Sequence, residues 1–254
     1  MTLRSIAIAA PAFDEADGIA ATVASWIDAL QARSFAHAEI VVCNDGSRDG
    51  TGALLDVLAR KSALVRPVHH LRNRGAAQAM ATAIAHTTAE WVLLLDADGQ
   101  FPIASLDRFE RAHAAYPDAV AFVGERDRKA DDALARTGAR LTTAALNALH
   151  GTHYRDLSSA CQLVRGDLLR ALPLEARGLN YSVEIAARLL EAGVRPVAVP
   201  IEHRAREAGR STRTLVRSSA ERAAFVAYFA MRRALLGGRV IATRVGAPDP
   251  CTSR

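Results

Sequence analysis

The chain has 254 residues, 50% of them hydrophobic and 23% charged, which is enough to bury one large core and argues against a disordered chain. Its three cysteines, Cys43, Cys161 and Cys251, are odd in number and lack metal-ligand spacing, so we expect reduced, unreactive thiols rather than disulfides or a zinc site. A net charge of +5 and a pI near 9.5 favour a polyanionic partner such as a nucleotide, a lipid phosphate or an anionic membrane, whereas the 5% aromatic content argues against nucleic acid.

Strand-like and helix-like segments alternate along the first half of the chain. We expect strands at Ser5 to Ala10, Glu39 to Cys43, Val65 to His70, Trp91 to Asp96 and Ala119 to Gly124. Helical composition and spacing occur at Ile19 to Gln31, Gly52 to Ala59, Ala76 to His86 and Ile103 to Ala115. This alternation predicts an α/β fold, with a mostly parallel central sheet flanked by helices.

The pattern is less regular after residue 130. We expect a helix over Asp131 to Leu149, a short strand over Cys161 to Val164, a helix over Ser182 to Glu191 and a strand over Arg195 to Pro200. A basic amphipathic helix at Leu215 to Gly237 and a frayed tail follow, so we divide the chain into residues 1–213 and 214–254. The apolar start, Ser5 to Ala10, is broken by Pro11 and fits neither a signal peptide nor a membrane span, which predicts a cytoplasmic protein.

Two carboxylates follow the apolar run Trp91 to Leu95, one residue apart. Asp96 and Asp98 should lie where ligands bind in open α/β sheets, at the carboxyl end of a buried strand. Mg²⁺ and Mn²⁺ prefer one or two protein carboxylates together with phosphate oxygens, so the pair is a candidate metal site. The alternative is an ordinary strand-to-helix turn, in which Asp and Gly are common.

Two further strands run into polar loops. The first ends at Pro11 to Glu15 and the second at Asn44 to Thr51. Because carboxyl ends of parallel strands share one edge, we expect Glu15, Asp45 and the Asp96/Asp98 pair to converge. Thr51 could cap the following helix, and an Asx-type turn is the structural alternative for this loop.

These motifs, in this order, resemble family 2 glycosyltransferases of the GT-A fold, and among them dolichol-phosphate and polyprenyl-phosphate sugar transferases. The resemblance rests on Pro-x-aromatic-x-Glu from Pro11, Asp45-Gly-Ser-x-Asp-Gly-Thr51, Asn73-Arg-Gly-Ala-Ala-Gln-Ala79 and Asp96-Ala-Asp-Gly-Gln-Phe-Pro102. It continues through Gly124-Glu-Arg126, Arg140, Asn147, Asp156-Leu-Ser-Ser159, Glu184 and the segment from Val199 to Ser211.

The resemblance implies a single Rossmann-like GT-A domain that binds a GDP- or UDP-linked sugar. Pro11, Phe13 and Glu15 would line the base and ribose pocket, and Asp45 would hydrogen-bond the base. Asp96 would lie near the ribose and the metal, and Asp98 and Gln100 would complete the Mg²⁺ or Mn²⁺ site, where the metal neutralises the departing diphosphate.

On the acceptor side, the resemblance assigns Arg126 and Arg140 to phosphates. Arg206 and Ser211 would lie in a loop that closes over the diphosphate, shaped by His203. Surface arginines and a packed histidine are the structural alternatives for these residues.

The chain departs from the family pattern at several positions. Asp14 stands where Asn is usual, and Asn44 where a first Asp is usual; neither change should abolish nucleotide binding. Ala160-Cys161-Gln162 lacks the Gly-aromatic-Arg or Lys of relatives that use lipid phosphates, and Thr212 replaces a usual Lys. The acceptor is therefore the least determined part of the prediction.

The resemblance therefore implies a metal-dependent inverting glycosyltransferase, a hexosyl- or N-acetylhexosaminyl-transferase that prefers a polyprenyl phosphate acceptor. Its basic amphipathic helix could contact the inner face of the membrane peripherally, or it could pack on its own domain, as helices with one apolar and one charged face usually do. A phosphate monoester is already an anion at neutral pH and needs no strong base. A soluble hydroxyl acceptor would need one, with Asp156 the first candidate and Glu184 the second; a turn aspartate and a helix-surface glutamate are the structural alternatives.

Two other classes compete with this prediction. A sugar-phosphate nucleotidyltransferase would need a basic Gly-rich loop near the N-terminus, where this chain is acidic. A non-catalytic nucleotide-sugar or lipid-binding module would not need Asp98 and Gln100 together with an arginine loop.

Overall fold

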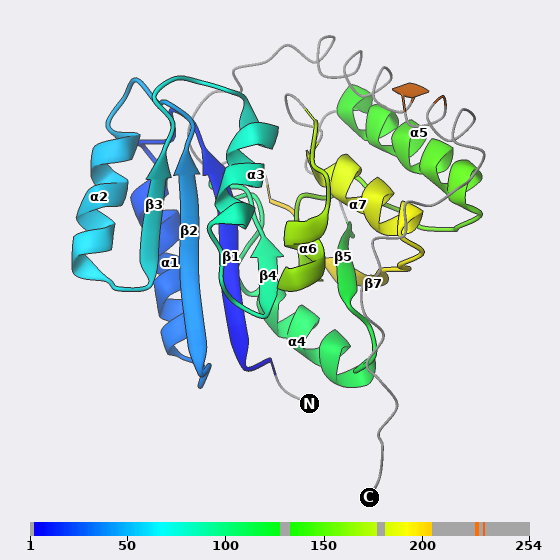
Figure 1. Cartoon of the computed structure of the whole chain (residues 1–254), viewed down its shortest axis with the longest axis horizontal. Coiled ribbons are helices and arrows are strands. Elements are labelled where there is room, and N and C mark those ends of the chain that lie inside the picture. Colours follow the sequence, from blue (N-terminus) through cyan, green and yellow to red (C-terminus); the bar gives the residue numbers. More distant parts are fainter. Residues whose placement is uncertain (1–2, 128–132, 177–180, 205–226, 229–230, 232–254) are drawn as a thin grey trace, which may run out of the picture.

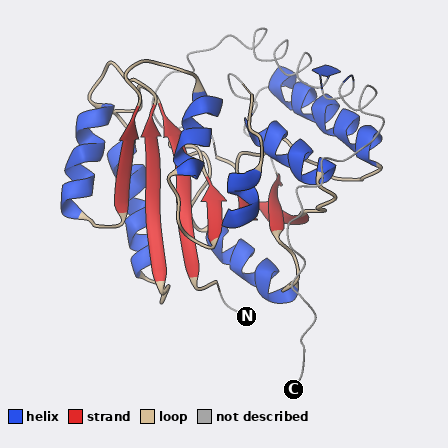
Figure 2. Cartoon of the chain, in the orientation of Figure 1, coloured by secondary structure: helices blue, strands red, loops and turns tan. Residues whose placement is uncertain are grey.

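Seven strands form one sheet in the computed structural model, which describes residues 3–127, 133–176, 181–204, 227, 228 and 231. The strands lie in the order β3-β2-β1-β4-β6-β5-β7. Their bounds are β1 Ser5–Ala12, β2 His37–Asn44, β3 Val65–His69, β4 Trp91–Leu94, β5 Ala121–Arg126, β6 Gln162–Arg165 and β7 Val197–Ile201. All neighbours pair in parallel except β6, which runs antiparallel to both β4 and β5. The predicted mostly parallel α/β sheet is confirmed (Figure 2).

Helices cover both faces of this sheet (Figure 1). Their bounds are α1 Ile19–Gln31, α2 Thr51–Lys61, α3 Ala76–Ala85, α4 Ser105–Ala115, α5 Ala133–His150, α6 Gly166–Ala171 and α7 Tyr181–Glu191. Helix α1 packs with α2, while α3 packs on β1 and β2 and contacts α6 and α7; α5 in turn packs on α7. Within the described part of the chain, no helix is both long and apolar enough to cross a bilayer.

Most predicted elements are present, with ends shifted by a few residues. The strand after residue 90 ends at Leu94 rather than Asp96, which leaves both acidic residues in the turn that follows it. The prediction missed α6, because its six residues are too few to show a helical period. Of the predicted helix at Leu215 to Gly237, three positions are described and helical; the rest, and the proposed boundary at residue 213, lie outside the described residues.

The core lies between the central strands and the two helical layers. Ile8 of β1 pairs in register with Ile40 of β2 and Leu93 of β4, and all three side chains are buried. Trp26 of α1 and Phe109 of α4 are among the largest fully buried side chains. Burying each such side chain stabilises the fold by roughly 1.5–3 kcal/mol, so the central strands are held firmly enough to position the loops at their ends.

One edge of the sheet collects the ends of many elements. The pairing of the strands places the ends of β1, β2, β3, β4, β5 and β7 there, together with the start of the antiparallel β6. In Figure 1 the arrows of β1, β2 and β3 point toward this edge. Strand β1 has β2 on one side and β4 on the other, so the chain order reverses beside β1. Such a switch point is where open α/β sheets bind ligands.

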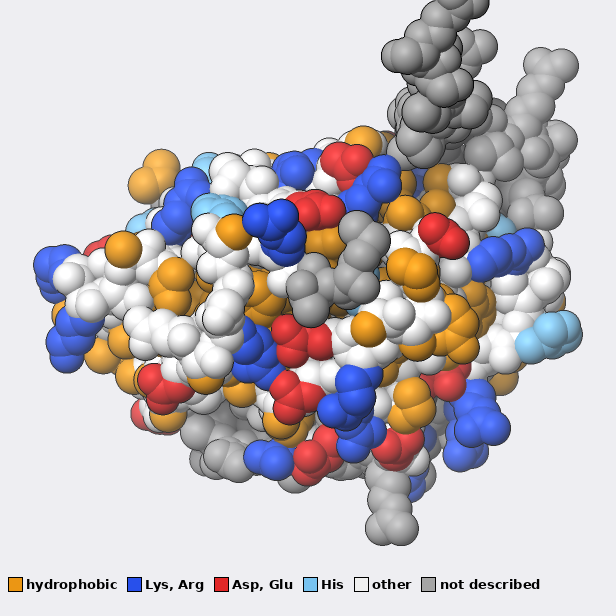
Figure 3. Space-filling model, turned by 90° about the horizontal axis from the view of Figure 1, so that it is seen from below, with side chains coloured by type: hydrophobic (Ala, Val, Ile, Leu, Met, Phe, Trp, Pro, Cys, Tyr) orange, Lys and Arg blue, Asp and Glu red, His pale blue; other side chains and the backbone are white. Residues whose placement is uncertain are grey.

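The opposite edge of the sheet carries charges of both signs. Figure 3, which looks at the molecule from below, shows basic and acidic side chains interspersed there. Several are paired: Arg33 with Asp107 and Glu110, and Arg66 with Glu39. Among the described residues, basic side chains at this edge are thus mixed with acidic ones and in part paired with them.

Candidate active site

The loops after β1 and β2 are locked together by hydrogen bonds. The Asp14 backbone N–H donates to Ser47 Oγ at 3.0 Å, and Asp14 Oδ1 accepts from the Arg48 N–H at 2.8 Å. Asp14 has a φ of 54°, in the left-handed region where Asn and Asp are the favoured residues after Gly. The replacement of the family's usual Asn by Asp14 is therefore compatible with the turn.

A second set of bonds fixes the start of α2 against the same β1 loop. Asp49 Oδ1 accepts from the Thr51 N–H at 2.9 Å, and Asp49 Oδ2 accepts from the Ala16 N–H at 3.0 Å. Thr51 Oγ1 accepts from the Glu15 N–H at 2.9 Å. Burial disfavours the Asp49 carboxylate, but the bonds from Thr51 and Ala16 outweigh it and lower its pKa. Gly50 is the N-cap of α2 and Thr51 is its first residue, so the predicted Thr51 cap is wrong; the Thr51 N–H is bound by Asp49 instead.

Asp45 follows β2 and is 1% exposed. Its Oδ1 accepts from the Arg74 N–H at 2.9 Å and lies 2.7 Å from Nδ1 of His70, and its Oδ2 accepts from the Gly75 N–H at 2.7 Å. Both oxygens already bind the protein, so the direct contact with a nucleotide base that we expected stays a prediction. In this geometry Asp45 holds the loop between β3 and α3.

That loop, Leu71 to Arg74, packs closely on Gly46. A Cβ on Gly46 would lie 2.5 Å from the Arg72 carbonyl carbon and 2.7 Å from the Asn73 nitrogen, and the φ of Gly46 is +69°. Both observations require glycine here. The loop's side chains are exposed, so its backbone contacts with Asp45 and Gly46 position it.

Asp96 and Asp98 lie in the turn after β4, as predicted. The Tyr181 hydroxyl, from the start of α7, donates to Asp96 Oδ1. Burial first, then the charge of Asp96 and its hydrogen bond, and then the charge of Asp98 raise the pKa of the Tyr181 phenol well above its usual value. Tyr181 thus contacts Asp96 directly, and Asp98 acts on the same phenol through its charge alone.

Gln100 joins this turn to the chain leaving β7. The Arg204 N–H donates to the Gln100 carbonyl at 2.9 Å, and Gln100 Nε2 donates to the Arg204 carbonyl at 3.3 Å. The ring of the buried His203 packs on Phe101, with centroids 5.0 Å apart. His203 thus fixes the beginning of the predicted closing loop, whereas Arg206 and Ser211 lie outside the described residues.

The donor set fits a hard divalent cation. Asp96 and Asp98 supply two carboxylates, and Gln100, whose amide nitrogen faces Arg204, has a carbonyl oxygen as a further hard donor in the same turn. Mg²⁺ and Mn²⁺ bind one or two carboxylates and take further oxygens from substrate phosphates and water. No cluster of three or more His, Cys, Asp or Glu side chains suited to a metal occurs among the residues that the structure describes.

Arg126, at the end of β5, pairs with Asp156, which precedes β6. Arg126 Nε lies 2.6 Å from Asp156 Oδ2, and its Nη2 lies 3.1 Å from Oδ1 and 2.8 Å from Ser158 Oγ. Asp156 Oδ1 also accepts from the backbone N–H and the hydroxyl of Ser158. Asp156 is buried, and its bond from the Ser158 N–H two residues on forms an Asx-type turn, so the alternative of a turn aspartate fits the structure. The assignments of Asp156 as base and Arg126 as phosphate ligand stay predictions, and either would require this ion pair to open.

Glu184 lies inside α7 and is 1% exposed, so the alternative of a helix-surface glutamate is wrong. Its two oxygens accept from the Glu175 and Ala176 N–H groups, both at 2.8 Å. Burial raises its pKa despite these bonds and the nearby Arg188. Glu184 therefore holds residues 175–176 against α7, a helix whose side chains are nearly all buried.

The remaining predicted residues lie at the same edge or near it. Pro11 is half-buried near the end of β1, Phe13 and Glu15 are half-buried in the loop after it, and Arg140 is exposed on α5. Asn147 is structural: its side chain donates to the Tyr154 carbonyl and accepts from Thr152 and the Tyr154 N–H. The buried Cys43 and Cys161 are free thiols, and burial, with the nearby Asp45, raises the pKa of Cys43 to about 12.

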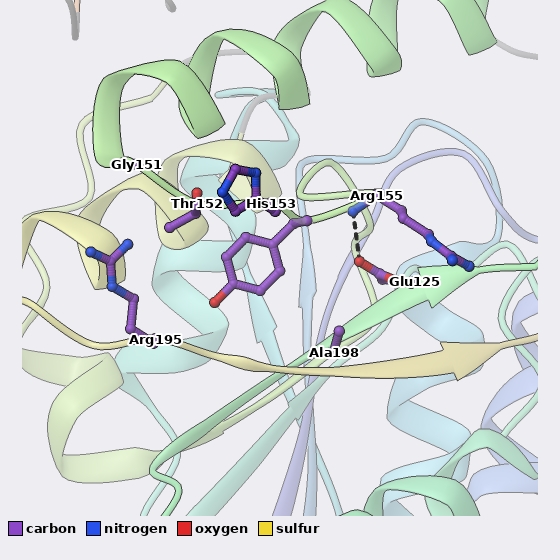
Figure 4. A pocket seen from close by; sticks show the side chains of 8 residues that line it. Glu125, Gly151, Thr152, His153, Arg155, Arg195 and Ala198 are labelled. Carbon is purple, nitrogen blue, oxygen red and sulfur yellow. Dashed lines mark hydrogen bonds between the residues drawn. The ribbon is translucent and has the colours of Figure 1, made fainter.

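A cavity of about 560 Å³ lies beside β5 and β7, lined by residues 151–155 and by Glu125, Arg195 and Ala198. Figure 4 shows Arg155 and Arg195 at opposite ends of it. Arg155 is tied through its backbone N–H to Glu125 Oε1, and Arg195 donates to the His150 carbonyl. The two guanidinium groups do not converge on one point, so the cavity is not arranged as a phosphate site.

Sequence reasoning missed two residues of the site, His70 and Tyr181. His70 stands at the carboxyl end of a predicted strand, and this position could have marked it as facing the shared edge. Tyr181 reaches Asp96 from 85 residues away, and nothing in its local sequence indicates that contact.

Comparison with known proteins gives a consistent assignment. The model of the family described as "Glycosyl transferase family 2" matches residues 7–172. A bactoprenol glucosyl transferase of Shigella phage SfX is 31% identical over 131 residues, covering 52% of this chain and 42% of the relative. An undecaprenyl-phosphate 4-deoxy-4-formamido-L-arabinose transferase of Edwardsiella ictaluri is 25% identical over 211 residues, covering 83% of this chain and 63% of the relative. The chain thus spans less than two thirds of the length of either relative.

Solved structures agree on the fold. Glucosyl-3-phosphoglycerate synthase from Mycobacterium tuberculosis, in complex with Mn²⁺, uridine diphosphate and phosphoglyceric acid, superposes with a TM-score of 0.68 at 20% identity, covering 96% of this chain and 82% of that chain. Its complex with Mn²⁺ and UDP-glucose has a TM-score of 0.65 at 19% identity, covering 90% and 79%. The seven-stranded sheet with its acidic turn after β4, and the family match over residues 7–172, show that this chain belongs to glycosyl transferase family 2.

Proposed function

We propose that this family 2 glycosyltransferase moves a sugar, with inversion, from a UDP- or GDP-linked donor to a polyprenyl phosphate, using Mg²⁺ or Mn²⁺. The observation that carries the proposal is that Asp96 and Asp98 lie in the turn after β4, a central strand that pairs with β1, beside the interlocked β1 and β2 loops. Two carboxylates at a switch point suit a metal-bound diphosphate.

The chain's own residues would share the work on the donor side. Pro11, Phe13 and Glu15 line the pocket for the base and ribose, and Asp45 keeps the facing loop in place. Asp96 and Asp98, with Gln100, would hold the metal, which when bound neutralises charge on the departing nucleoside diphosphate. Tyr181 orients Asp96 through its hydroxyl.

The state of the two candidate bases favours an acceptor that is already an anion. Both oxygens of Asp156 are engaged by Arg126 and Ser158, and both oxygens of Glu184 accept backbone N–H groups. A hydroxyl acceptor needs a base within hydrogen-bond reach, whereas a phosphate monoester carries its own negative charge. The names of the bactoprenol and undecaprenyl-phosphate relatives point in the same direction.

A soluble hydroxyl acceptor is the second candidate. Phosphoglyceric acid is bound in solved structures that share this fold. In this case Asp156 would have to leave Arg126 and act as the base, so activity should depend on Asp156 more strongly than on Arg126.

The first experiment identifies the donor. We expect one of UDP-glucose, UDP-N-acetylglucosamine and GDP-mannose, with Mn²⁺, to raise the melting temperature, because a ligand that binds only the folded state stabilises it in proportion to the logarithm of its concentration over Kd. A nucleotide sugar that raises the melting temperature equally well without the metal would contradict the assignment of the site. So would a melting temperature that none of the nucleotide sugars raises.

The second experiment measures transfer to polyprenyl phosphate and to phosphoglyceric acid. Asp98→Asn should keep its fold and lose most turnover, because a ligand charge is removed where charge develops on the leaving group. The matched control is Asp118→Asn, an exposed position before β5 at the opposite edge, which should keep the parent rate. A wild-type protein that binds donor and transfers sugar to neither acceptor would favour a non-catalytic binding module.

A further inference from the structure

A chain of hydrogen-bonded side chains links the end of β2 to helix α3. His70 Nδ1 lies 2.7 Å from Asp45 Oδ1, and His70 Nε2 lies 2.9 Å from Thr82 Oγ1. The His70 side chain is only 7% exposed. His70 therefore connects a carboxylate at the candidate donor site to the middle of a helix that packs on β1 and β2.

The partners of His70 define the tautomer of its ring. An ionised carboxylate can only accept, so the proton of a neutral His70 lies on Nδ1 and is donated to Asp45. Nε2 then accepts from the Thr82 hydroxyl, with the Cys43 thiol 3.5 Å away as a weak second donor. Each ring nitrogen thus has a defined role, and the orientation of the ring follows from both.

The consequence of this orientation appears in the loop at Leu71 to Arg74. Leu71 is 106% exposed, and the other side chains of the loop are exposed as well, so side-chain packing does not fix the loop. The same Asp45 carboxylate that His70 holds accepts the Arg74 and Gly75 N–H groups. If the carboxylate rotates, the backbone of the loop moves with it.

We propose that His70 is a positioning residue of the donor site, which clamps Asp45 between α3 and the loop at Leu71 to Arg74 and so sets where that loop meets the nucleoside. The inference rests on the proposed function for the identity of the ligand, a nucleoside diphosphate. The clamp itself is a property of the described contacts.

Two substitutions separate the two ends of the clamp. The amide nitrogen of Asn can take the place of Nδ1, so His70→Asn keeps a donor for Asp45 and loses the bond to Thr82. The longer Gln places its amide near the position of Nε2, so His70→Gln keeps a partner for Thr82 and loses the donor to Asp45. The exposed His37→Asn at the start of β2 is the control for the change of residue type.

The measurement is the Kd of UDP and of GDP, each with Mn²⁺, and the kcat and KM of the donor sugar. His70→Gln should weaken binding of the preferred nucleotide by about tenfold, the loss expected for one charge-assisted hydrogen bond. His70→Asn should weaken it by less than about threefold, and Kd should change more than kcat because contacts to the nucleoside are the same in the ground and transition states. A folded His70→Gln protein with the Kd of the parent would overturn the inference.

A second readout needs no nucleotide. Trypsin cleaves after Arg72 and Arg74, so the cleavage rate in the loop reports how firmly Asp45 holds it. His70→Gln should be cut several times faster than His70→Asn, and equal rates would contradict the clamp. If neither UDP nor GDP binds the wild-type protein, the proposed function fails, and the cleavage rates still decide the role of His70.

Discussion

Gly46 offers a test of the loop geometry at the proposed donor site. In Gly46→Ala the new Cβ would lie 2.5–2.7 Å from backbone atoms of Arg72 and Asn73. Alanine in the left-handed region costs about 1–2 kcal/mol. The loop must also move away, and losing one of the Asp45 bonds to Arg74 or Gly75 adds about 1.5–3 kcal/mol. We therefore expect a loss of about 3–5 kcal/mol, a fall in Tm of roughly 6–20 °C for a chain of this size.

Gly193→Ala is the matched control. Gly193 has a φ of +78°, similar to the +69° of Gly46, but nothing lies within 4 Å of the position of its Cβ. This variant should lose about 1–2 kcal/mol, from the backbone conformation alone. Thermal and urea unfolding measure the loss of stability in both variants, and the difference between the two losses is the cost of the close contact between the new Cβ and Arg72. Equal losses of stability would refute the argument that Gly46 positions the loop, and so would a Gly46→Ala protein that keeps the full nucleotide-dependent rise in Tm.

Three other measurements test separate parts of the molecule. Asp156→Ala should lower the free energy of unfolding by about 3–5 kcal/mol, because it removes the carboxylate that pairs with the largely buried Arg126. The Asp156→Leu/Arg126→Met double variant should lose less, and urea titration of both variants compares the two losses. Burial opposes ionisation of Glu39, but N–H groups of residues 88 and 89 outweigh it and lower its pKa below the usual 4.5. Its stabilising contribution is therefore complete above about pH 4.5 and is lost as the pH falls through the lowered value, so wild type and Glu39→Gln should differ in stability at pH 7 and converge in acid. Neutralising the arginines of segment 214–254 should abolish salt-sensitive flotation with anionic liposomes, and a wild-type protein that never floats would favour a soluble acceptor.

The sheet could be predicted from the sequence because its signals are local. Short apolar runs ending in Pro, Asn or Asp gave β1, β2 and β4 within two residues of their observed ends, and helical spacing gave α1 with the observed bounds. The convergence of Glu15, Asp45 and Asp96 at one edge followed from parallel pairing alone. The antiparallel direction of β6 has no such signal, because direction depends on a connection through α5.

The partners of the site residues could not be predicted, because they depend on contacts between distant parts of the chain. Arg126 meets Asp156 30 residues later, and a helical pattern cannot show that Glu184 is covered on all sides by its neighbours. Charged residues are usually exposed, and the surface alternative for Glu184 followed this tendency. It failed because hydrogen bonds from backbone N–H groups compensate for the burial of this carboxylate.

The two sides of the site are stabilised in different ways, and this difference bears on the acceptor. On the donor side, carboxylates accept backbone N–H groups, so Asp45 and Asp49 hold the loops in one arrangement before any ligand arrives. On the proposed acceptor side, the guanidinium of Arg126 is held by Asp156 and Ser158 side chains, and a phosphate acceptor would offer the same kind of oxygen acceptor as Asp156. A phosphate acceptor would give Arg126 a new anion while Asp156 keeps its bonds from the Ser158 N–H and hydroxyl, whereas a hydroxyl acceptor would bring no anion to Arg126 in place of Asp156. The ion pair therefore suits a phosphate acceptor better than a neutral one.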